Sequence, residues 1–473
     1  MTNLLQFFID GAWRDPLDGQ MCPIVNPATE QPIYSVALGS KRDVDAAVAA
    51  ARRAFDTYSL DPAERVALLE RLIEAYQGRA TDLARAISDE MGAPLSFAEQ
   101  FQVKAGLAHI VATRDAMKAY KFEEKFGSVL VRREAIGVVG MITPWNWPLN
   151  QIVAKVAPAL AAGCTMVLKP SELTPSSGAI FAEIVDQIGV PPGVFNLIHG
   201  LGPEVGSALA EHPDVDMISF TGSTRAGVDV ALRAAPTVKR VGQELGGKSP
   251  NIILENANFE EAVAGGAKFL FNNAGQSCAA PSRMLVPLSR MDEAAAIAKR
   301  VADDIRVGDP RGADTQMGPV ISETQWNKIQ SYIRSGIDEG ATLAAGGPGR
   351  PVGIDRGFFV KPTVFSQVTN DMRIAREEIF GPVLVVIGYR DTAEAISIAN
   401  DTPYGLSGYV SGGTPDEALD VARRIRAGTI NLNGAMFDRT APFGGYKQSG
   451  NGREWGKFGM EDFLEVKAIA GAA

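Results

Sequence analysis

The sequence predicts an α/β protein with two lobes, each built on a parallel sheet. Short apolar runs typical of buried strands, such as residues 165–168 and 217–220, alternate with helical stretches. This alternation favours right-handed crossover units and parallel strands. A second alternating series begins beyond about Gly246, and 473 residues exceed what one core usually holds. We therefore expect two α/β lobes with a cleft between them.

The first lobe is expected to be rich in helix. Val66, Leu69, Ile73 and Tyr76 recur at steps of three and four, which predicts an amphipathic helix, and residues 46–55 have a similar pattern. Residues 128–133 alternate as a half-buried strand does. The apolar run 135–142 predicts a fully buried strand.

The second lobe follows the same plan. Residues 251–254 predict a strand, and helices are expected near 260–272 and 292–305. The Gly/Pro-rich stretch 346–353 is typical of a surface loop. The end of the chain, around Phe463 and Val466, has no following helix. We expect a terminal strand there that pairs with another element or another subunit.

Composition excludes several classes of function. The 55 acidic and 46 basic residues give a net charge of -9 without a basic stripe, so nucleic acid and anionic membranes are not expected partners. The start of the chain lacks the basic region of a signal peptide, and no apolar run is long enough to span a membrane. Three cysteines predict no disulfide framework and a cytoplasmic protein, and three dispersed histidines predict no metal site.

Two residues are candidates for covalent chemistry. Cys278 lies in the segment 275–280 (GQSCAA), whose small side chains leave a sulfur accessible to a substrate. A lone cysteine is also typical of a buried structural position. Glu244 is followed closely by Gly246 and Gly247. A carboxylate on such a flexible loop can reorient without steric strain and activate water as a general base. A surface glutamate before a turn fits the same pattern.

A third candidate has a rarer setting. Asn146 lies in the segment 143–148 (TPWNWP), which follows the predicted strand at 135–142 directly. Two prolines fix the backbone and two tryptophans form apolar walls around one amide. An amide held in this way suits the stabilisation of a developing oxyanion. The alternative is a rigid structural turn.

Three further segments have the residue types of a dinucleotide site. Lys169 and Glu172 follow a predicted strand, where an acid can accept hydrogen bonds from ribose hydroxyls. The segment 222–227 (GSTRAG) follows another strand and can open a helix whose N-terminal amides receive phosphate. Glu378 and Phe380 place an acid beside an aromatic at a tight turn. The glycine spacing differs from the usual dinucleotide fingerprint.

Together and in this order, these segments resemble the NAD(P)-dependent, non-acylating branch of the aldehyde dehydrogenase superfamily. The resemblance covers nearly the whole chain, from residues 8–11 (FIDG) and 26–29 (NPAT) to the terminal strand. It implies a Rossmann-type cofactor domain (1–119 and 137–246), an α/β catalytic domain (247–454) and a small β oligomerisation element (120–136 and 455–473). Members form homodimers and homotetramers.

The resemblance also implies roles for the candidates. Cys278 is similar to the catalytic thiol, Glu244 to the general base, and Asn146 to the oxyanion donor that acts with the Cys278 backbone N–H. The implied cofactor-binding residues are Trp145, Lys169, Glu172, Gly222, Ser223, Glu378 and Phe380. The implied substrate-lining residues are Trp147, Gln151, Ser277 and Phe443. Arg439, on the segment 436–443, could pair with a substrate carboxylate or be an ordinary loop arginine.

The expected reaction is oxidation of a small-molecule aldehyde to a carboxylic acid through a thioester on Cys278. Glu172 favours NAD over NADP, because its carboxylate would meet a 2′-phosphate at close range. Two alternatives remain. One is a dehydrogenase that transfers the acyl group to coenzyme A, although such branches commonly lack the glutamate found here as Glu244. The other is a catalytically silent binding protein on the same fold.

Overall fold

The first lobe is built on an eight-stranded sheet. The structure, a computed structural model, describes residues 3–471. Five central strands run parallel, and the N-terminal hairpin and a short C-terminal strand extend the sheet antiparallel. In spatial order the strands are β19 (Gly450–Asn451), β11 (Arg240–Glu244), β10 (Met217–Thr221), β7 (Val138–Ile142), β8 (Thr165–Lys169), β9 (Phe195–Leu197), β1 (Phe7–Ile9) and β2 (Ala12–Arg14).

Helices cover this sheet, and the predicted amphipathic helix is among them. In α2, Leu69 and Tyr76 are fully buried, which confirms the stripe read from the sequence. The predicted helix at 46–55 is the middle of α1. The longer helices are α1 (Lys41–Thr57), α2 (Pro62–Gly78), α3 (Ala80–Met91), α5 (Val103–Ala119), α6 (Pro148–Ala162), α7 (Pro175–Gln187) and α9 (Thr224–Ala234).

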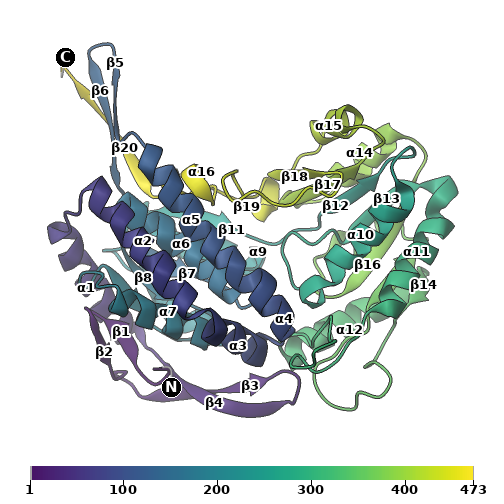
Figure 1. The fold of residues 1–473 in the computed structure, drawn as a ribbon, viewed down its shortest axis with the longest axis horizontal. Coiled ribbons are helices and arrows are strands. Elements are labelled where there is room, and N and C mark those ends of the chain that lie inside the picture. Colours follow the sequence, from purple (N-terminus) through teal and green to yellow (C-terminus); the bar gives the residue numbers. More distant parts are fainter. Residues whose placement is uncertain (1–2, 472–473) are drawn as a thin grey trace.

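The second lobe contains a seven-stranded sheet that is parallel apart from one edge strand. Helices cover both of its faces, with α10 and α11 in one apolar core and α14 and α15 in another (Figure 1). The strands in order are β14 (Thr342–Ala345), β15 (Thr363–Ser366), β16 (Val383–Tyr389), β13 (Arg283–Pro287), β12 (Pro250–Ile253), β17 (Ser407–Ser411) and β18 (Thr429–Leu432). The helices are α10 (Phe259–Phe271), α11 (Met291–Asp304), α12 (Glu323–Asp338), α14 (Thr392–Asn400) and α15 (Pro415–Ala422).

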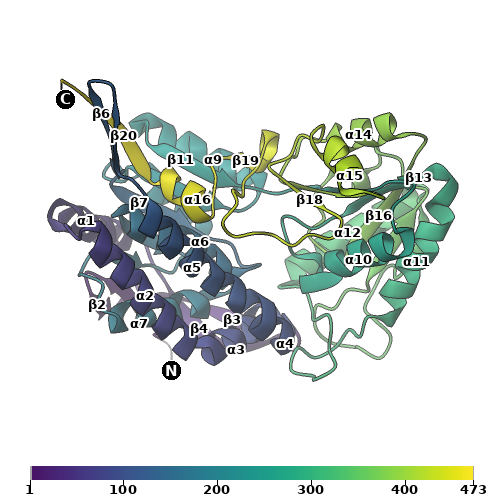
Figure 2. The ribbon, with the colours of Figure 1, turned by 45° about the horizontal axis from the view of Figure 1, so that its top comes forward.

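A three-stranded antiparallel sheet projects from the first lobe (Figures 1 and 2). It consists of β5 (Glu123–Phe126), β6 (Val129–Ala135) and the terminal strand β20 (Leu464–Ala470). The expected terminal strand is therefore present, and it pairs with β6. Before reaching β20 the chain returns from the second lobe to the first through β19 and α16 (Gly456–Asp462), so this last segment lies against both lobes.

Two expectations from the sequence were incomplete. The predicted strand at 135–142 is divided, because Ala135 ends β6 and β7 begins only at Val138. Gly137 has a φ of 133° between them, and the Asp216 carboxylate accepts a hydrogen bond from the Val138 N–H at 2.7 Å. The other omission is N-terminal: besides β1 and β2, the chain forms the hairpin β3 (Gln20–Asn26) and β4 (Gln31–Leu38).

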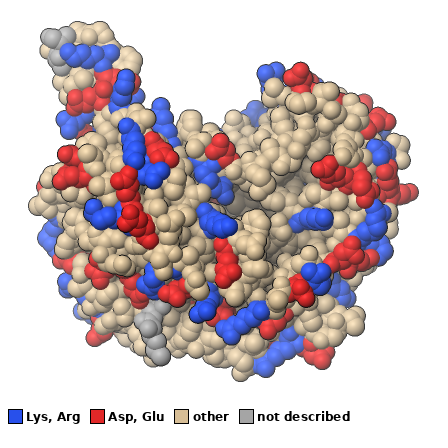
Figure 3. Space-filling view, in the orientation of Figure 1, with Lys and Arg blue, Asp and Glu red and all other residues tan. Residues whose placement is uncertain are grey.

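The surface matches the composition. On the face shown in Figure 3, acidic and basic side chains are interspersed, and a hollow lies between the two lobes. Over residues 3–471, no helix has the length and apolar character needed to cross a membrane.

Candidate active site

Cys278 lies on the loop that joins α10 to β13, beside the space between the lobes, and its side chain is partly accessible. The loop leaves the helix through three successive residues with positive φ, Asn273 at 56°, Ala274 at 54° and Gly275 at 70°. A Cβ on Gly275 would lie 2.1 Å from the Gly381 carbonyl oxygen. Glycine is therefore required for both the backbone conformation and the close approach, and this turn directs the chain to the thiol.

A buried amide network holds this turn against the Asn146 segment. The Asn273 amide donates to the backbone oxygens of Asn146 at 3.0 Å and Gln276 at 3.1 Å. Its own oxygen accepts from Gln102 at 3.0 Å. Such satisfied buried networks restrict a site to one geometry. Asn273 and Gln102 were not predicted, because nothing in the sequence distinguishes these buried amides from amides on the surface.

Asn146 is 3% exposed and its Nδ2 donates to the Gln276 carbonyl at 3.1 Å. An amide nitrogen carries two hydrogens, so one remains for a second acceptor. The backbone N–H of Cys278 donates to no acceptor within residues 3–471. The Asn146 segment and the Cys278 loop therefore offer one N–H donor each, and both could stabilise negative charge on an oxygen next to the sulfur.

Glu244 ends β11 and is 5% exposed, yet neither carboxylate oxygen has a hydrogen-bond partner within the described chain. Burial raises its pKa well above the ordinary value, and the neighbouring Glu454 carboxylate adds to the effect. Buried polar groups without protein partners usually bond to water. A buried carboxylate of raised pKa is a strong base, suited to taking a proton from such a water.

An ion pair that the sequence analysis missed lies near Glu244. The Lys155 ammonium, on α6, is almost fully buried and donates to the Glu454 carboxylate. Lys155 lowers the pKa of Glu244, whereas Glu454 raises it. The two residues are 299 positions apart, so no local pattern could pair them.

Carboxylates also control the state of the thiol. Burial, together with Glu244 and Glu378, which oppose a second negative charge, raises the pKa of Cys278 to about 12. Cys278 is therefore protonated at neutral pH in the ligand-free site. Its conversion to a nucleophilic thiolate requires a base or added positive charge nearby.

The predicted ribose pair forms at the carboxyl end of β8. The buried Lys169 ammonium donates to the Glu172 carboxylate at 3.1 Å, and the Glu172 side chain is 28% exposed, so it can still accept from a ligand. In the same sheet, β10 leads through Gly222 into α9, whose N-cap is Ser223. The Ser223 hydroxyl accepts a hydrogen bond from the Ala226 N–H at 3.3 Å. This helix N-terminus suits a phosphate group.

The remaining predicted cofactor residues lie between the lobes. The Trp145 and Phe380 rings meet edge to face at 5.4 Å, and Phe380 has a φ of 59°. Glu378 accepts from the Gly247 N–H at 2.9 Å. A Cβ on Gly246 would lie 2.3 Å from the Glu378 carboxylate, so glycine is what allows Glu378 to approach the Glu244 loop.

An apolar cluster surrounds the thiol. Phe443 and Trp455 stack at 4.2 Å and pack with Ala154, Leu406, Phe437 and Cys278. Of the other residues predicted to line the substrate funnel, Trp147 donates to the Ser277 hydroxyl at 2.8 Å, and Gln151 is buried on α6. The Arg439 guanidinium stacks on Trp455 at 4.2 Å. Phe437 and Trp455 were not predicted individually.

The other two cysteines lie on other segments of the chain. Cys164 is fully buried, and burial raises its pKa to about 12. Cys22 is half-buried on β3. Within residues 3–471 no group of three or more His, Cys, Asp or Glu side chains is arranged to hold a metal ion.

A thiol, a buried carboxylate and two free N–H donors between two parallel-sheet lobes define a protein capable of covalent catalysis at a carbonyl carbon. Comparison with known proteins gives the family. The model of the "Aldehyde dehydrogenase family" matches residues 13–469, so the chain belongs to the aldehyde dehydrogenase family.

Relatives match over their full length. The chain is 55% identical to a 3-succinoylsemialdehyde-pyridine dehydrogenase from a Pseudomonas species, covering 100% of this chain and 99% of that protein. A mutant of aldehyde dehydrogenase C from Pseudomonas syringae, in complex with NAD+ and octanal, has a TM-score of 0.99 at 54% identity, covering 100% and 97% of the two chains. A Mycobacterium tuberculosis aldehyde dehydrogenase complexed with NAD+ has a TM-score of 0.96 at 41% identity, covering 98% of each chain.

Proposed function

We propose that this protein oxidises an aldehyde to a carboxylic acid, with NAD as hydride acceptor and Cys278 as nucleophile. The observation that carries the proposal is the grouping of the Cys278 thiol with the buried, unpartnered Glu244 carboxylate and the Asn146 amide. Family membership and the NAD+ complexes of similar proteins support it.

The first half of the reaction belongs to Cys278 and Asn146. The sulfur attacks the aldehyde carbon, and the oxygen that becomes negative is stabilised by the free Asn146 hydrogen and the Cys278 backbone N–H. The proton of the thiol passes to solvent, to which the Cys278 side chain is partly accessible. Loss of hydride from the same carbon leaves a thioester on Cys278.

The second half belongs to Glu244. Its unpartnered oxygens accept a proton from water, and the resulting hydroxide attacks the thioester, releasing the acid and restoring the thiol. Lys155 and Glu454 lie close enough to influence the charge of Glu244. Dividing the oxidation from the hydrolysis replaces one difficult step with two easier ones.

The cofactor site is assigned to Trp145, Lys169, Glu172, Gly222, Ser223, Glu378 and Phe380. The exposed part of the Glu172 carboxylate fits ribose hydroxyls, and the N-terminus of α9 fits the pyrophosphate. NAD, when bound, supplies the hydride acceptor. Because the Glu172 carboxylate repels a 2′-phosphate, NADP is the poorer cofactor.

The rival functions fit less well. Transfer of the acyl group to coenzyme A does not require a buried base, yet Glu244 is present beside the thiol. A silent binding protein would not need the Asn146 donor, the thiol and the carboxylate together. Neither rival is favoured by the named relatives.

The proposal also covers the domains, the oligomeric state and the cellular location of the protein. The residues 1–119 with 137–246 form the cofactor domain, 247–454 the catalytic domain, and 120–136 with 455–473 an oligomerisation element. An isolated three-stranded sheet that exposes Phe126, Val466 and Ile469 gains from contact with another subunit, which supports a homodimer or homotetramer. The free cysteines support a cytoplasmic location.

The nucleophile is tested with Cys278→Ala. We expect loss of NADH formation with every aldehyde but an unchanged dissociation constant for NAD, because a small side chain replaces another. The matched control is Cys164→Ala, which should keep its activity. Wild-type kcat in Cys278→Ala, together with loss in Cys164→Ala, would show that the assignment is wrong.

A further inference from the structure

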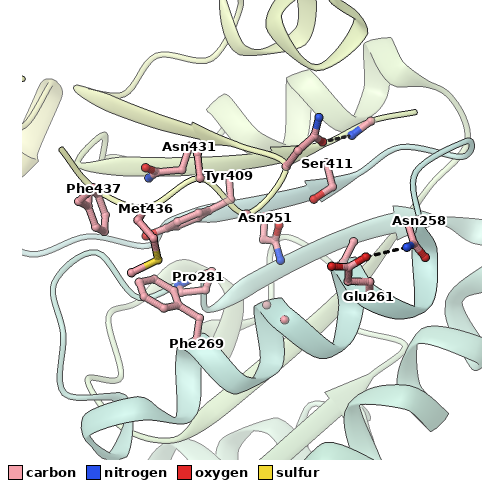
Figure 4. Close-up of a pocket in the computed structure, with 17 residues that line it drawn as sticks. Asn251, Asn258, Glu261, Phe269, Pro281, Tyr409, Ser411, Asn431, Met436 and Phe437 are labelled. Atoms are coloured by element: carbon pink, nitrogen blue, oxygen red, sulfur yellow. Dashed lines mark hydrogen bonds between the residues drawn. The ribbon is translucent and has the colours of Figure 1, made fainter. Parts of the chain in front are cut away.

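A cavity of about 420 Å³ lies in the second lobe, and of its lining residues only Phe437 belongs to the apolar cluster around the thiol. It is bounded by α10 on one side and by β12, β17 and β18 on the other (Figure 4). Its volume is within the range of small-molecule sites. One end is apolar, with Phe269, Met436 and Phe437, and the other is formed by the exposed pair Asn258 and Glu261.

A buried amide lines the cavity without a hydrogen-bond partner in the described chain. Asn431 is 7% exposed, and its Nδ2 donates to no acceptor. Asn251, 4% exposed, is a second buried amide in the cavity wall. A buried donor left unpaired is costly, so its position in a cavity wall indicates a ligand that supplies an acceptor.

The charge of the lining restricts that ligand. Glu261 is the only ionisable acid or base besides Tyr409 among the lining residues, and no lysine or arginine is present. A carboxylate would therefore meet a like charge and no cation. The aromatic rings of Phe269, Tyr409 and Phe437 contact one another edge to face or tilted, at 5.6 to 6.5 Å. The walls suit an uncharged ring.

Helix α10 leaves this space open through Gly265 and Gly266. A Cβ on Gly266 would lie 2.3 Å from the Asn251 amide, so the close approach of Asn251 requires glycine at this position. A Cβ on Gly265 would meet nothing within 4 Å, so packing does not require glycine there. Glycine inside a helix costs about 1 kcal/mol relative to alanine. Its presence is consistent with a cavity that must remain open.

The cavity adjoins the thiol. Phe437 contacts Phe269 and Tyr409 in the cavity on one side, and Phe443 and Trp455 of the cluster around Cys278 on the other. The Tyr409 hydroxyl donates to the Ala279 carbonyl at 2.7 Å, one residue after the nucleophile. Phe437 is therefore shared between the cavity and the cluster around Cys278.

We propose that the cavity is a distal substrate subsite, which takes the far end of an aldehyde carrying an uncharged aromatic ring with a hydrogen-bond acceptor. Asn431 donates to that acceptor, and Phe269, Tyr409 and Phe437 enclose the ring. The inference rests on the proposed function and specifies its substrate class.

The test compares phenylpropanal with pyridylpropanal, whose ring nitrogen is the only added acceptor. The wild-type enzyme should have a kcat/KM about fivefold to tenfold higher for the pyridyl compound, as one neutral hydrogen bond provides. In Asn431→Leu, which keeps the side-chain size without the donor, the ratio should fall to about one. Propanal, too short to reach the cavity, should be oxidised equally by both enzymes.

A second variant closes the cavity without removing a polar group. Gly265→Leu suits the helix and projects into the open space, so we expect kcat/KM for both aryl aldehydes to fall about tenfold or more while that for propanal stays unchanged. Gly265→Ala is the matched control and should retain most aryl activity. The melting temperatures of all variants show that the fold is intact.

The outcomes separate the two proposals. Absence of propanal oxidation in the wild type would overturn the proposed function. Normal propanal oxidation with equal kcat/KM for the two aryl aldehydes would overturn the subsite alone, as would unchanged aryl activity in Gly265→Leu. A preference for the ω-oxo acid of octanal over octanal itself, lost in Arg439→Met, would place the recognition of the far end at Arg439 and also overturn it.

Discussion

At the scale of single residues, the chemistry depends on a carboxylate that opposes the ionisation of the nucleophile. Glu244 is buried beside the half-buried Cys278, and its negative charge raises the pKa of the Cys278 thiol. Once Glu244 is ionised, its charge disfavours the Cys278 thiolate. The ligand-free enzyme therefore holds its nucleophile as a protonated thiol until the alkaline range.

This coupling predicts how Cys278 reacts with iodoacetamide. In the wild type the alkylation rate should rise with pH well beyond the ordinary thiol pKa of about 8.5. In Glu244→Gln, one of the opposing charges is absent, so the thiol pKa should fall and alkylation in the alkaline range should be faster, about tenfold for each unit of pKa. Peptide mass spectrometry distinguishes Cys278 from Cys22 and Cys164. Slower alkylation in Glu244→Gln would contradict the coupling and indicate that Glu244 acts mainly as a base for the thiol.

The sequence was sufficient to nominate residues only where unusual types cluster locally. Asn146 between two tryptophans and Cys278 among small residues were visible as candidates. Asn273, Gln102, Lys155 and Glu454 were not, because their partners are distant in the chain and polar residues of these types are common. Spatial grouping of this kind is set by the fold and leaves no local pattern.

At the scale of elements, the order of strands and helices was predicted better than their ends. Periodicity located α2, α10 and α11, and apolar runs located β8, β10 and β12. The run 135–142 was misread at its start because Ile136 and Gly137, which are apolar or small, connect two different sheets. The N-terminal strands were missed because β1 and β2 have only three residues each, β3 is largely exposed, and β4 is buried only at its end.

Glu172, which follows the end of β8 at Lys169, is expected to determine the preference for NAD over NADP. Glu172→Ser should lower kcat/KM with NAD about tenfold or more, since a hydrogen bond to a charged group contributes about 1.5–3 kcal/mol. It should raise kcat/KM with NADP relative to NAD, because the repulsion of a 2′-phosphate is removed and Lys169 loses its ion-pair partner. Glu204→Ser, at an exposed site on the same lobe, is the control and should leave the ratio unchanged. A wild-type enzyme with a higher kcat/KM for NADP than for NAD would contradict this interpretation of Glu172.

At the scale of the whole molecule, the two lobes bring together groups that neither could supply alone. Asn146 and Glu244 come from the first sheet and its connections, whereas Cys278 and Glu378 come from the second lobe. The C-terminal segment completes the site with Phe443, Glu454 and Trp455 as it crosses between the lobes. The reaction is therefore a property of the assembled fold.

Rapid mixing of Glu244→Gln with NAD and aldehyde tests the central claim, a thioester on Cys278 that Glu244 helps to hydrolyse. The account predicts a burst of about one equivalent of NADH per active site and then a slow steady rate, because oxidation proceeds while the acyl-enzyme accumulates. Mass spectrometry of the stopped reaction should find the acyl group on the Cys278 peptide. A steady rate equal to that of the wild type across neutral pH, with no burst and no acylated peptide, would contradict it.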